Sequence, residues 1–175
     1  MKKVFWGIAL FLFILTGCST YEKEEEDDGM IWDFVNLSVP ILVTDADGNN
    51  LLDKESPDNI LENDIKAIYR DETYQRLSFE QSAVRFNMPE PLGLRTTVRK
   101  YSNDKTMIIL TFGGFSPESN HHNESFTIYW GDGTSDIIKF DFYIIWENKK
   151  NPQVHSKFYL NDQEWNKGGP ITIVK

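Results

Sequence analysis

Short runs of β-branched and aromatic residues, separated by turn residues, recur along the chain from Met30 onward. Such runs favour strands, and clusters of Gly, Pro, Asn and Asp favour the turns between them. We therefore expect nine strands: Leu37 to Thr44, Ile65 to Tyr69, Ala83 to Phe86, Thr96 to Tyr101, Thr106 to Phe112, Ser125 to Trp130, Ser135 to Trp146, Ser156 to Leu160 and Ile171 to Val174. Nine short strands predict an all-β fold, either a sandwich or a barrel. A single helical turn is expected between Ser56 and Glu62, with Pro57 at its first position.

The clearest local structure surrounds Gly131-Asp132-Gly133, which separates two strand-like runs. Glycine adopts the positive φ that tight hairpin turns require, so a β-hairpin is predicted here. On the return strand, alternate residues should face the core, because successive side chains of a strand point to opposite sides. This inward set is Ile138, Phe140, Phe142, Ile144 and Trp146. A second tight turn is expected at Asn161-Asp162-Gln163.

The string Trp130-Gly131-Asp132-Gly133-Thr134 resembles the W-x-x-G-D-G turn of immunoglobulin-like domains of the polycystic-kidney-disease (PKD) type. It lacks the complete Trp-Asp-Phe-Gly-Asp-Gly string of those domains. The resemblance implies an immunoglobulin-like antiparallel β-sandwich. It adds no catalytic residue.

The first 18 residues have the organisation of an export signal. A positive pair, Lys2-Lys3, precedes an apolar run from Val4 to Leu15, which is too short for the roughly 20 residues of a membrane-spanning helix. The string Leu15-Thr16-Gly17-Cys18 that follows resembles the bacterial lipobox. This resemblance implies cleavage before Cys18 and acylation of its thiol and amine, for example with palmitate. A conventional secretory signal with an incidental cysteine is the alternative.

The segment between Cys18 and Gly29 is polar and strongly acidic, and offers nothing to bury. We interpret it as a lipidated tether, whose roughly eleven residues reach about 35 to 40 Å. The acidic block Lys23-Glu24-Glu25 resembles the signal that sends lipoproteins of Bacteroidota-type bacteria to the outer face of the outer membrane. A merely solvated linker is the other interpretation. The whole chain resembles the small β-sandwich surface lipoproteins of such bacteria, which implies an outer-membrane protein anchored by lipid and exposed at the cell surface.

Charge and cysteine content restrict the folded part of the chain. Removal of residues 1–17 takes away two lysines and no acid, so the formal net charge of −9 becomes −11. An acidic body repels phosphate backbones, which argues against nucleic acid as a partner. Cys18 is the only cysteine, so no disulfide is available. Residues 30–175 are long enough for one domain with its own core, and we expect a single β-sandwich domain there.

One loop has the composition of a cation site. Its oxygen-bearing side chains are Asp45, Asp47, Asn49 and Asp53, which are spaced so that they could converge on calcium. The spacing departs from an EF-hand, because the glycine is fourth instead of sixth and the twelfth residue is Ser56. The favoured interpretation is therefore a turn in which Asp and Asn accept local backbone hydrogen bonds and Leu51-Leu52 return under the sheet. No cofactor is expected otherwise.

Catalytic motifs are absent from the sequence. There is no Gly-x-Ser-x-Gly elbow, no phosphate-binding loop and no Gly-x-Gly-x-x-Gly. His121-His122 are neighbours, and neighbouring side chains of an extended chain diverge, so an exposed loop is favoured over a zinc site with Glu118 or Glu124. Paired carboxylates remain open, because 27 acids offer many pairs. Whether the protein is an enzyme is left open, with a non-enzyme favoured.

Aromatic residues near the C-terminal end are candidates for ligand stacking. Trp165 lies in a polar run and is the least easily explained as core, and Tyr159 is close to it in sequence. Core filling is the alternative for most of the aromatic residues. The sequence thus favours a non-catalytic surface lipoprotein that serves as a binding or accessory module for a glycan or another surface protein. A structural or adhesive component of a surface assembly is the second interpretation, and a hydrolase is the third.

Overall fold

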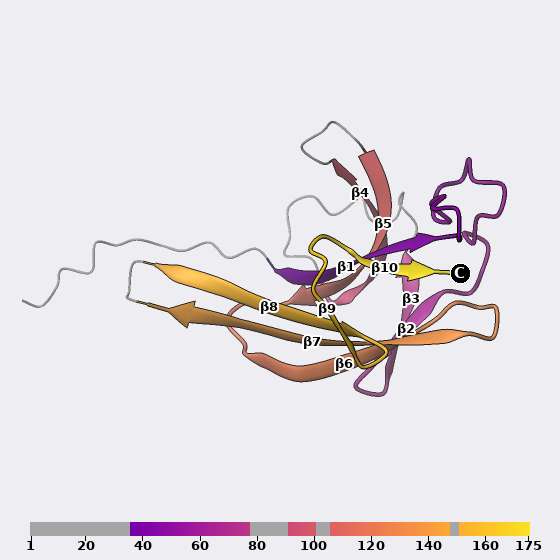
Figure 1. Ribbon diagram of the computed structural model, residues 1–175. Helices are drawn as coiled ribbons and strands as arrows, with labels where there is room; N and C mark the ends of the chain where they lie inside the picture. Colours follow the sequence, from indigo (N-terminus) through magenta and orange to yellow (C-terminus); the bar gives the residue numbers. More distant parts are fainter. Residues whose placement is uncertain (1–35, 78–90, 101–105, 148–150) are drawn as a thin grey trace, which may run out of the picture. The chain divides into compact units, whose positions relative to one another are not determined.

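The computed structural model describes residues 36–77, 91–100, 106–147 and 151–175 (Figure 1). These residues form ten strands: β1 (Leu37–Thr44), β2 (Lys66–Tyr69), β3 (Glu72–Leu77), β4 (Gly93–Lys100), β5 (Thr106–Phe115), β6 (His121–Tyr129), β7 (Ser135–Trp146), β8 (Pro152–Leu160), β9 (Gln163–Trp165) and β10 (Ile171–Val174). No helix occurs within these ranges, so the protein is all-β as described. The expected helical turn between Ser56 and Glu62 is wrong. Those residues form successive turns, in which the Asn59 N–H donates to the Ser56 carbonyl at 3.2 Å.

The strand predictions hold best where apolar residues alternate clearly. The expected bounds of β1, β7 and β10 are confirmed residue for residue. β5 and β8 contain the strands predicted there, and β2, β4 and β6 overlap theirs with shifted ends. Two strands, β3 and β9, were not expected. The predicted strand from Ala83 to Phe86 lies outside the described residues.

The ten strands form one sheet in the order β10-β1-β5-β4-β3-β2-β6-β7-β8-β9. The sheet is mixed, because β1 pairs with β10 and β3 pairs with β4 in parallel, whereas the other neighbours are antiparallel. It is nearly closed into a barrel. Its two end strands, β9 and β10, are consecutive in the chain and are joined by residues 166–170.

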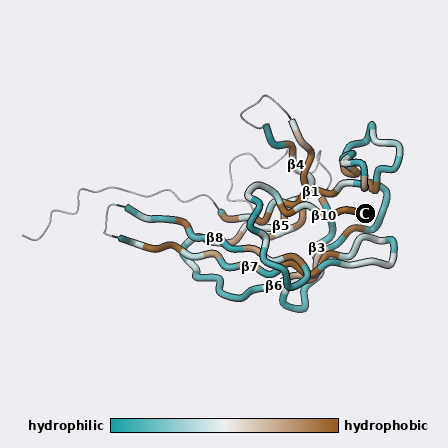
Figure 2. Tube along the Cα trace, in the orientation of Figure 1, coloured by the Kyte–Doolittle hydropathy of each residue, from teal (hydrophilic) through white to brown (hydrophobic). Residues whose placement is uncertain are grey.

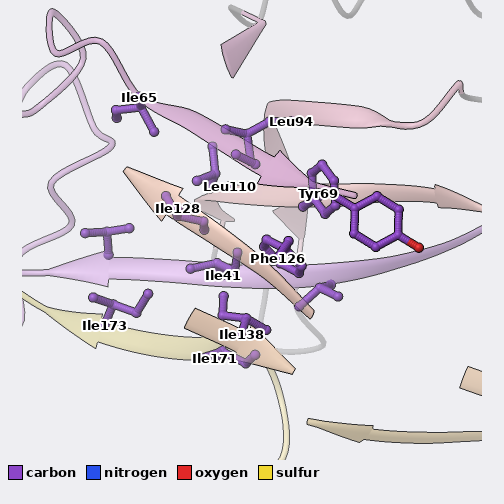
Figure 3. Close-up of a cluster of buried hydrophobic side chains, with 14 of the residues drawn as sticks. Ile41, Ile65, Tyr69, Leu94, Leu110, Phe126, Ile128, Ile138, Ile171 and Ile173 are labelled. Carbon is purple, nitrogen blue, oxygen red and sulfur yellow. The ribbon is translucent and has the colours of Figure 1, made fainter. Parts of the chain in front are cut away.

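The core lies between the two halves of this sheet (Figure 3). The ring of Phe112 in β5 is 4.4 Å from that of Phe126 in β6, and the ring of Phe115 is 4.7 Å from that of Phe140 in β7. All four side chains are buried. Burial of a side chain of this size stabilises the folded state by about 1.5 to 3 kcal/mol, so this contact between the halves is a principal source of stability.

The Gly131-Asp132-Gly133 hairpin is confirmed as the connection between β6 and β7. Tyr129 pairs with Ser135, and both glycines have positive φ, 74° for Gly131 and 87° for Gly133. The preceding Trp130 is fully buried, and its indole N–H donates to Asp136 Oδ2 at 2.7 Å. The turn therefore ends in a tryptophan anchored within the core.

Beyond the core, β7 and β8 continue as a two-stranded arm (Figure 1). β6 begins at His121, which pairs with Phe142, so residues Tyr143–Trp146 of β7 pair only with residues Pro152–His155 of β8 among the described strands. Figure 2 shows that both strands of the arm carry apolar positions. The expected burial of Ile138, Phe140 and Phe142 is confirmed.

Trp146 departs from the predicted inward set. It lies on the same face as Phe142, because the two are four residues apart in one strand. It is nevertheless 49% exposed, and Ile144 is half-buried. The reason is that the arm extends past the opposite half of the sheet, so alternation alone does not bury its outermost residues.

Candidate functional site

The outward side of β7, β8 and β9 is the most distinctive exposed surface of the described chain. Because Ile138, Phe140 and Phe142 point into the core, the intervening residues of β7 and their partners in β8 point away from it. We call this surface the outer face; its members are Ile137, Lys139, Asp141, Tyr143, Ile145, Gln153, His155, Lys157, Tyr159 and Glu164. It combines aromatic and aliphatic side chains with charges of both signs.

Three rings cluster at the centre of the outer face, and two of them are stacked. The rings of Tyr143 and His155 lie 4.4 Å apart at 27° to each other, and the ring of His122 is 4.7 Å from that of Tyr143. His122 Nδ1 is also 3.9 Å from the carboxylate of Asp141. The same Asp141 oxygen, Oδ1, accepts a hydrogen bond at 2.8 Å from the N–H of Asn123, whose φ is +52°. A bulge in β6 thus places His122 beside the two strands of the arm.

The sequence did not single out this three-ring cluster. His122 was expected in an exposed loop, but β6 begins at His121, and His121 instead contacts the ring of Phe115 at 5.2 Å. Alternation in β7 places Tyr143 outward, as the sequence indicates. The positions of His122 and His155 beside it depend on strand pairing, which no local pattern states.

Tyr159, a predicted stacking residue, lies on the outer face opposite Glu164. The ammonium of Lys157 is 5.0 Å from the Tyr159 ring centroid and 2.9 Å from Glu164 Oε2. Hydrogen bonds with Tyr159 and then Glu164 raise the pKa of Lys157. The tyrosine is therefore part of an ionic cluster at one end of the face.

Trp165, the other predicted stacking residue, points to the opposite side of the sheet. It pairs with Phe158, whereas Tyr159 pairs with Glu164, and paired residues share a face. Trp165 packs against the hydrophobic core, and its ring lies 5.3 Å from the Lys167 ammonium. Its buried indole N–H has no hydrogen-bond partner among the described residues. The structure therefore does not bring Tyr159 and Trp165 together into one platform.

The predicted cation loop is organised around local hydrogen bonds. The two carboxylate oxygens of Asp45 accept from the backbone N–H and the side-chain amide of Asn49, at 2.8 and 2.7 Å. These hydrogen bonds, with the side-chain one contributing most, lower the pKa of Asp45. Asp53 Oδ1 accepts from the Glu55 N–H at 3.1 Å, and Asp47 is exposed. Leu51 and Leu52, which follow the turn, are buried in the core.

A second polar cluster lies at the turn between β2 and β3. The hydroxyl of Tyr69 donates to Glu124 Oε2 at 3.2 Å, and Arg70 forms an ion pair with the same carboxylate. Burial, and then the charge of Glu124, raise the pKa of Tyr69 to about 12. Arg70 and Asp71 both have positive φ without being glycine, which is a strained turn. This cluster links the turn to β6 and was not expected from the sequence.

Three further observations concern metal ligands, membrane-spanning helices and the N-terminal segment. Within the described ranges, no group of three or more His, Cys, Asp or Glu side chains converges on a position suited to a metal ion. No helix of the described part is long and apolar enough to cross a membrane. Cys18 and the acidic tether lie outside the described residues.

Comparisons with known proteins leave the geometry as the basis for assigning a role. No protein-family model matches the chain, and neither a curated protein nor a solved structure matches it. The candidate site has the chemistry of an aromatic and charged strand surface.

Proposed function

We propose that the protein is a non-catalytic binding module that recognises another surface protein through the outer face. The observation that carries this proposal is the exposure of Ile137 and Ile145, 45% and 47%, beside the stacked Tyr143. Exposed aliphatic and aromatic side chains interspersed with charges are the composition of protein interfaces, in which tyrosine is enriched. A glycan is the less favoured ligand, because the Tyr143 ring already has the rings of His155 and His122 within 4.4 and 4.7 Å of it.

The carboxylates with shifted pKa values support a binding role over a hydrolytic one. Hydrogen bonds lower the pKa of Asp45 and hold that of Asp132 near 2, and both residues stabilise turns. A general acid for glycoside hydrolysis instead needs a carboxyl group whose pKa is raised. Neither of these two residues is suited to that role at neutral pH.

A lipid anchor and an immunoglobulin-like sandwich fold complete the proposal. Acylation at Cys18, followed by the acidic tether, places the module on the outer face of the outer membrane. The contact between two sheet halves and the Trp130 hairpin are features that an immunoglobulin-like sandwich would also have. Under this proposal the two parallel strand pairs are additions to that architecture.

A structural role in a surface assembly is the second candidate function. The observation in its favour is the edge of β8, which β9 covers only from Phe158 to Leu160. An open edge can pair with a strand of another chain, as adhesive and fibrous assemblies do. The two candidates predict different contact sites, namely the outer face or the edge.

Site-specific photo-crosslinking on the producing cells tests the proposal. A benzoylphenylalanine replaces Ile145 on the outer face, Ser156 on the β8 edge, or, as a matched control, Thr73 in β3. We expect a discrete protein adduct from position 145 alone. An adduct only from position 156 would support the assembly role, and equal labelling at 145 and 73 would contradict a specific outer-face partner.

The anchor is tested separately with Cys18→Ser. We expect the variant to lose its lipid mass and to leave the membrane fraction, because acylation needs the thiol. The acyl chains contribute about 0.8 kcal/mol per buried CH₂ to membrane binding, so their loss should be easily detected in fractionation. Unchanged lipid mass and partitioning would show that the anchor assignment is wrong.

A further inference from the structure

Within the described ranges, Asp141 is the acidic side chain of the outer face that pairs with no lysine or arginine. Lys139, in the same strand, forms an ion pair with Asp162 instead. Lys157 lies directly opposite Asp141 in β8, but its ammonium pairs with Glu164 at 2.9 Å. The outer face thus keeps one carboxylate available to a cation from another molecule.

The backbone of β6 holds this carboxylate in place. Oδ1 of Asp141 accepts the Asn123 N–H at 2.8 Å, and the Asp141 side chain is 25% exposed. No donor among the described residues forms a hydrogen bond with Oδ2. Because the first hydrogen bond already fixes the carboxylate, a second donor that approaches Oδ2 has little side-chain freedom left to remove. Asp141 is therefore a preorganised acceptor that is partly shielded from water.

The surroundings of Asp141 resemble the centre of a protein interface. Tyr143 follows it on the same face and stacks on His155, and the next residue of that face, Ile145, is 47% exposed. Apolar side chains that exclude water strengthen an ion pair beside them, and arginine is enriched in interfaces. The formal net charge of −9 also favours the approach of a basic surface. Both features select a cationic partner group over an anionic one.

We propose that the partner of the outer face presents an arginine or lysine side chain to Oδ2 of Asp141. The inference rests on the proposed function and names the charge that the partner brings to the contact. Arginine is the better fit of the two, because its guanidinium is more weakly hydrated than an ammonium and packs readily beside aromatic rings.

His122 makes this contact sensitive to pH. Its Nδ1 lies 3.9 Å from Oδ1 of Asp141, and histidine is the side chain that ordinarily changes its charge between pH 5 and 8. A protonated His122 would compete with the partner's cation for the carboxylate, so binding should weaken as the pH falls through this range. The other titratable or charged side chains on the neighbouring strands are His155 and Tyr143 in their stack, Lys139 and Lys157 in their own ion pairs, His121 against Phe115, and Glu124 bound to Tyr69 and Arg70.

Amide chemical shifts of the soluble Cys18→Ser mature chain, titrated with N-acetylarginine methylamide, test the cation site. The Asn123 amide reports on Asp141. The Glu55 amide donates to Oδ1 of Asp53 at 3.1 Å and is a matched reporter on a carboxylate elsewhere. We expect the Asn123 amide to respond at a probe concentration about threefold lower than the Glu55 amide. Equal responses of the two amides would overturn the proposal.

Two substitutions that remove the same charge separate the site from the overall charge. Asp141→Asn keeps an oxygen that can accept from Asn123, and it should abolish the preference for this site. Asp58→Asn, at an exposed turn, should retain the preference. Loss of the preference in both variants would show that only net charge attracts the probe, and would refute the proposal.

The same titration at two pH values tests the competition and does not require the Asp141 variant to fold. We expect the Asn123 response to need about threefold more probe near pH 5.5 than near pH 7.5. In His122→Gln the two pH values should give the same response. A pH dependence that persists unchanged in His122→Gln would contradict the placement of the cation beside His122.

Photo-crosslinking distinguishes this inference from the proposed function itself. With benzoylphenylalanine in place of Ile145, Asp141→Asn should lower the adduct yield about threefold, and Asp58→Asn should leave it unchanged. A yield that Asp141→Asn does not alter would overturn the cationic contact and leave the outer face as the binding surface. Absence of any adduct would contradict the proposed function, and with it a partner at Asp141.

Discussion

The two glycines of the β6–β7 hairpin should differ in their tolerance of alanine. Both have positive φ, which costs a residue with a Cβ about 1 to 2 kcal/mol. The reduced entropy of the unfolded chain returns about 0.4 to 1 kcal/mol in each case. A Cβ on Gly133 would have nothing within 4 Å, so Gly133→Ala should lower the free energy of unfolding by about 1 kcal/mol.

Gly131 has an additional constraint, because its backbone approaches a neighbouring loop. A Cβ there would lie 2.6 Å from the Asp64 backbone nitrogen and 3.2 Å from the Asn63 Cβ. The loop cannot yield easily, since the next residue, Ile65, is buried and its carbonyl accepts from the Arg76 N–H at 3.0 Å. Overpacking of this kind adds about 1 to 3 kcal/mol. Gly131→Ala should therefore cost about 2 to 4 kcal/mol in total.

Urea unfolding and thermal melting of the soluble Cys18→Ser mature chain, both monitored by tryptophan fluorescence, measure the two costs. For a domain of this size, 1 kcal/mol corresponds to roughly 2 to 4 °C in Tm, so Gly131→Ala should melt roughly 4 to 16 °C below the parent. Gly133→Ala should melt only a few degrees below it. If the two variants have equal free energies of unfolding, the close approach of Gly131 to Asp64 does not carry the difference, and the reasoning from contact distance is refuted.

Three further predictions concern titration and metal. Hydrogen bonds from Thr134 and then Lys175 hold the pKa of Asp132 near 2. The contribution of Asp132 to stability is therefore present above about pH 4 and is lost as the pH falls towards 2. Across this pH range, the urea midpoints of Asp132→Asn should fall less steeply than those of the parent. Burial and then Glu124 raise the pKa of Tyr69 to about 12. The contribution of Tyr69 to folding stability is therefore present below pH 10 and is lost as the pH rises to 12. Tyr69→Phe should reduce the phenolate absorbance near pH 12 and flatten the dependence of stability on pH there. If the Asp45 loop bound calcium, calcium at 100 times its dissociation constant would raise the free energy of unfolding by about 2.7 kcal/mol. Both carboxylate oxygens of Asp45 already accept hydrogen bonds from Asn49, so chelator and excess calcium should give the same Tm. A shift of several degrees would contradict the turn assignment.

The sequence predicted those parts of the fold that have a strong local pattern. β7 alternates apolar and polar residues from Ile138 to Phe142 within a long run of strand-favouring residues, and its bounds were predicted correctly. β3 was missed because its sequence, Glu-Thr-Tyr-Gln-Arg-Leu, has little apolar alternation and its side chains are mostly exposed. The turn before it is formed by Arg70 and Asp71 at positive φ, without the glycine that normally marks such a turn. Tertiary contacts with Glu124 stabilise that turn, and no local pattern encodes them.

The candidate site was harder to predict, because its members meet only through strand pairing. Tyr143 and His155 are twelve positions apart in the sequence and stack because β7 and β8 are in register there. Tyr159 and Trp165 are closer in sequence, yet they point to opposite faces, because the turn at Asn161-Asp162 pairs Tyr159 with Glu164 and Phe158 with Trp165. A register shift of one residue at that turn would move the Trp165 side chain from the core-facing side of the sheet to the outer face.

This dependence on register connects the stability of the turn to the binding proposal. Asn161 has a φ of +49°, accepts from the Ile137 N–H through Oδ1 at 2.9 Å, and donates from Nδ2 to Asp136 Oδ1 at 2.7 Å. Asp136 in turn holds the indole of the buried Trp130. The side chain of Asn161 therefore holds β8 in register with β7. It does so while bonded to the Asp136 carboxylate, which also anchors the β6–β7 hairpin through Trp130. β7 and β8 form the outer face together, and their register decides which side chains lie on it. The polar contacts of Asn161 at the β8–β9 turn therefore determine which side chains of the arm are presented to the proposed partner.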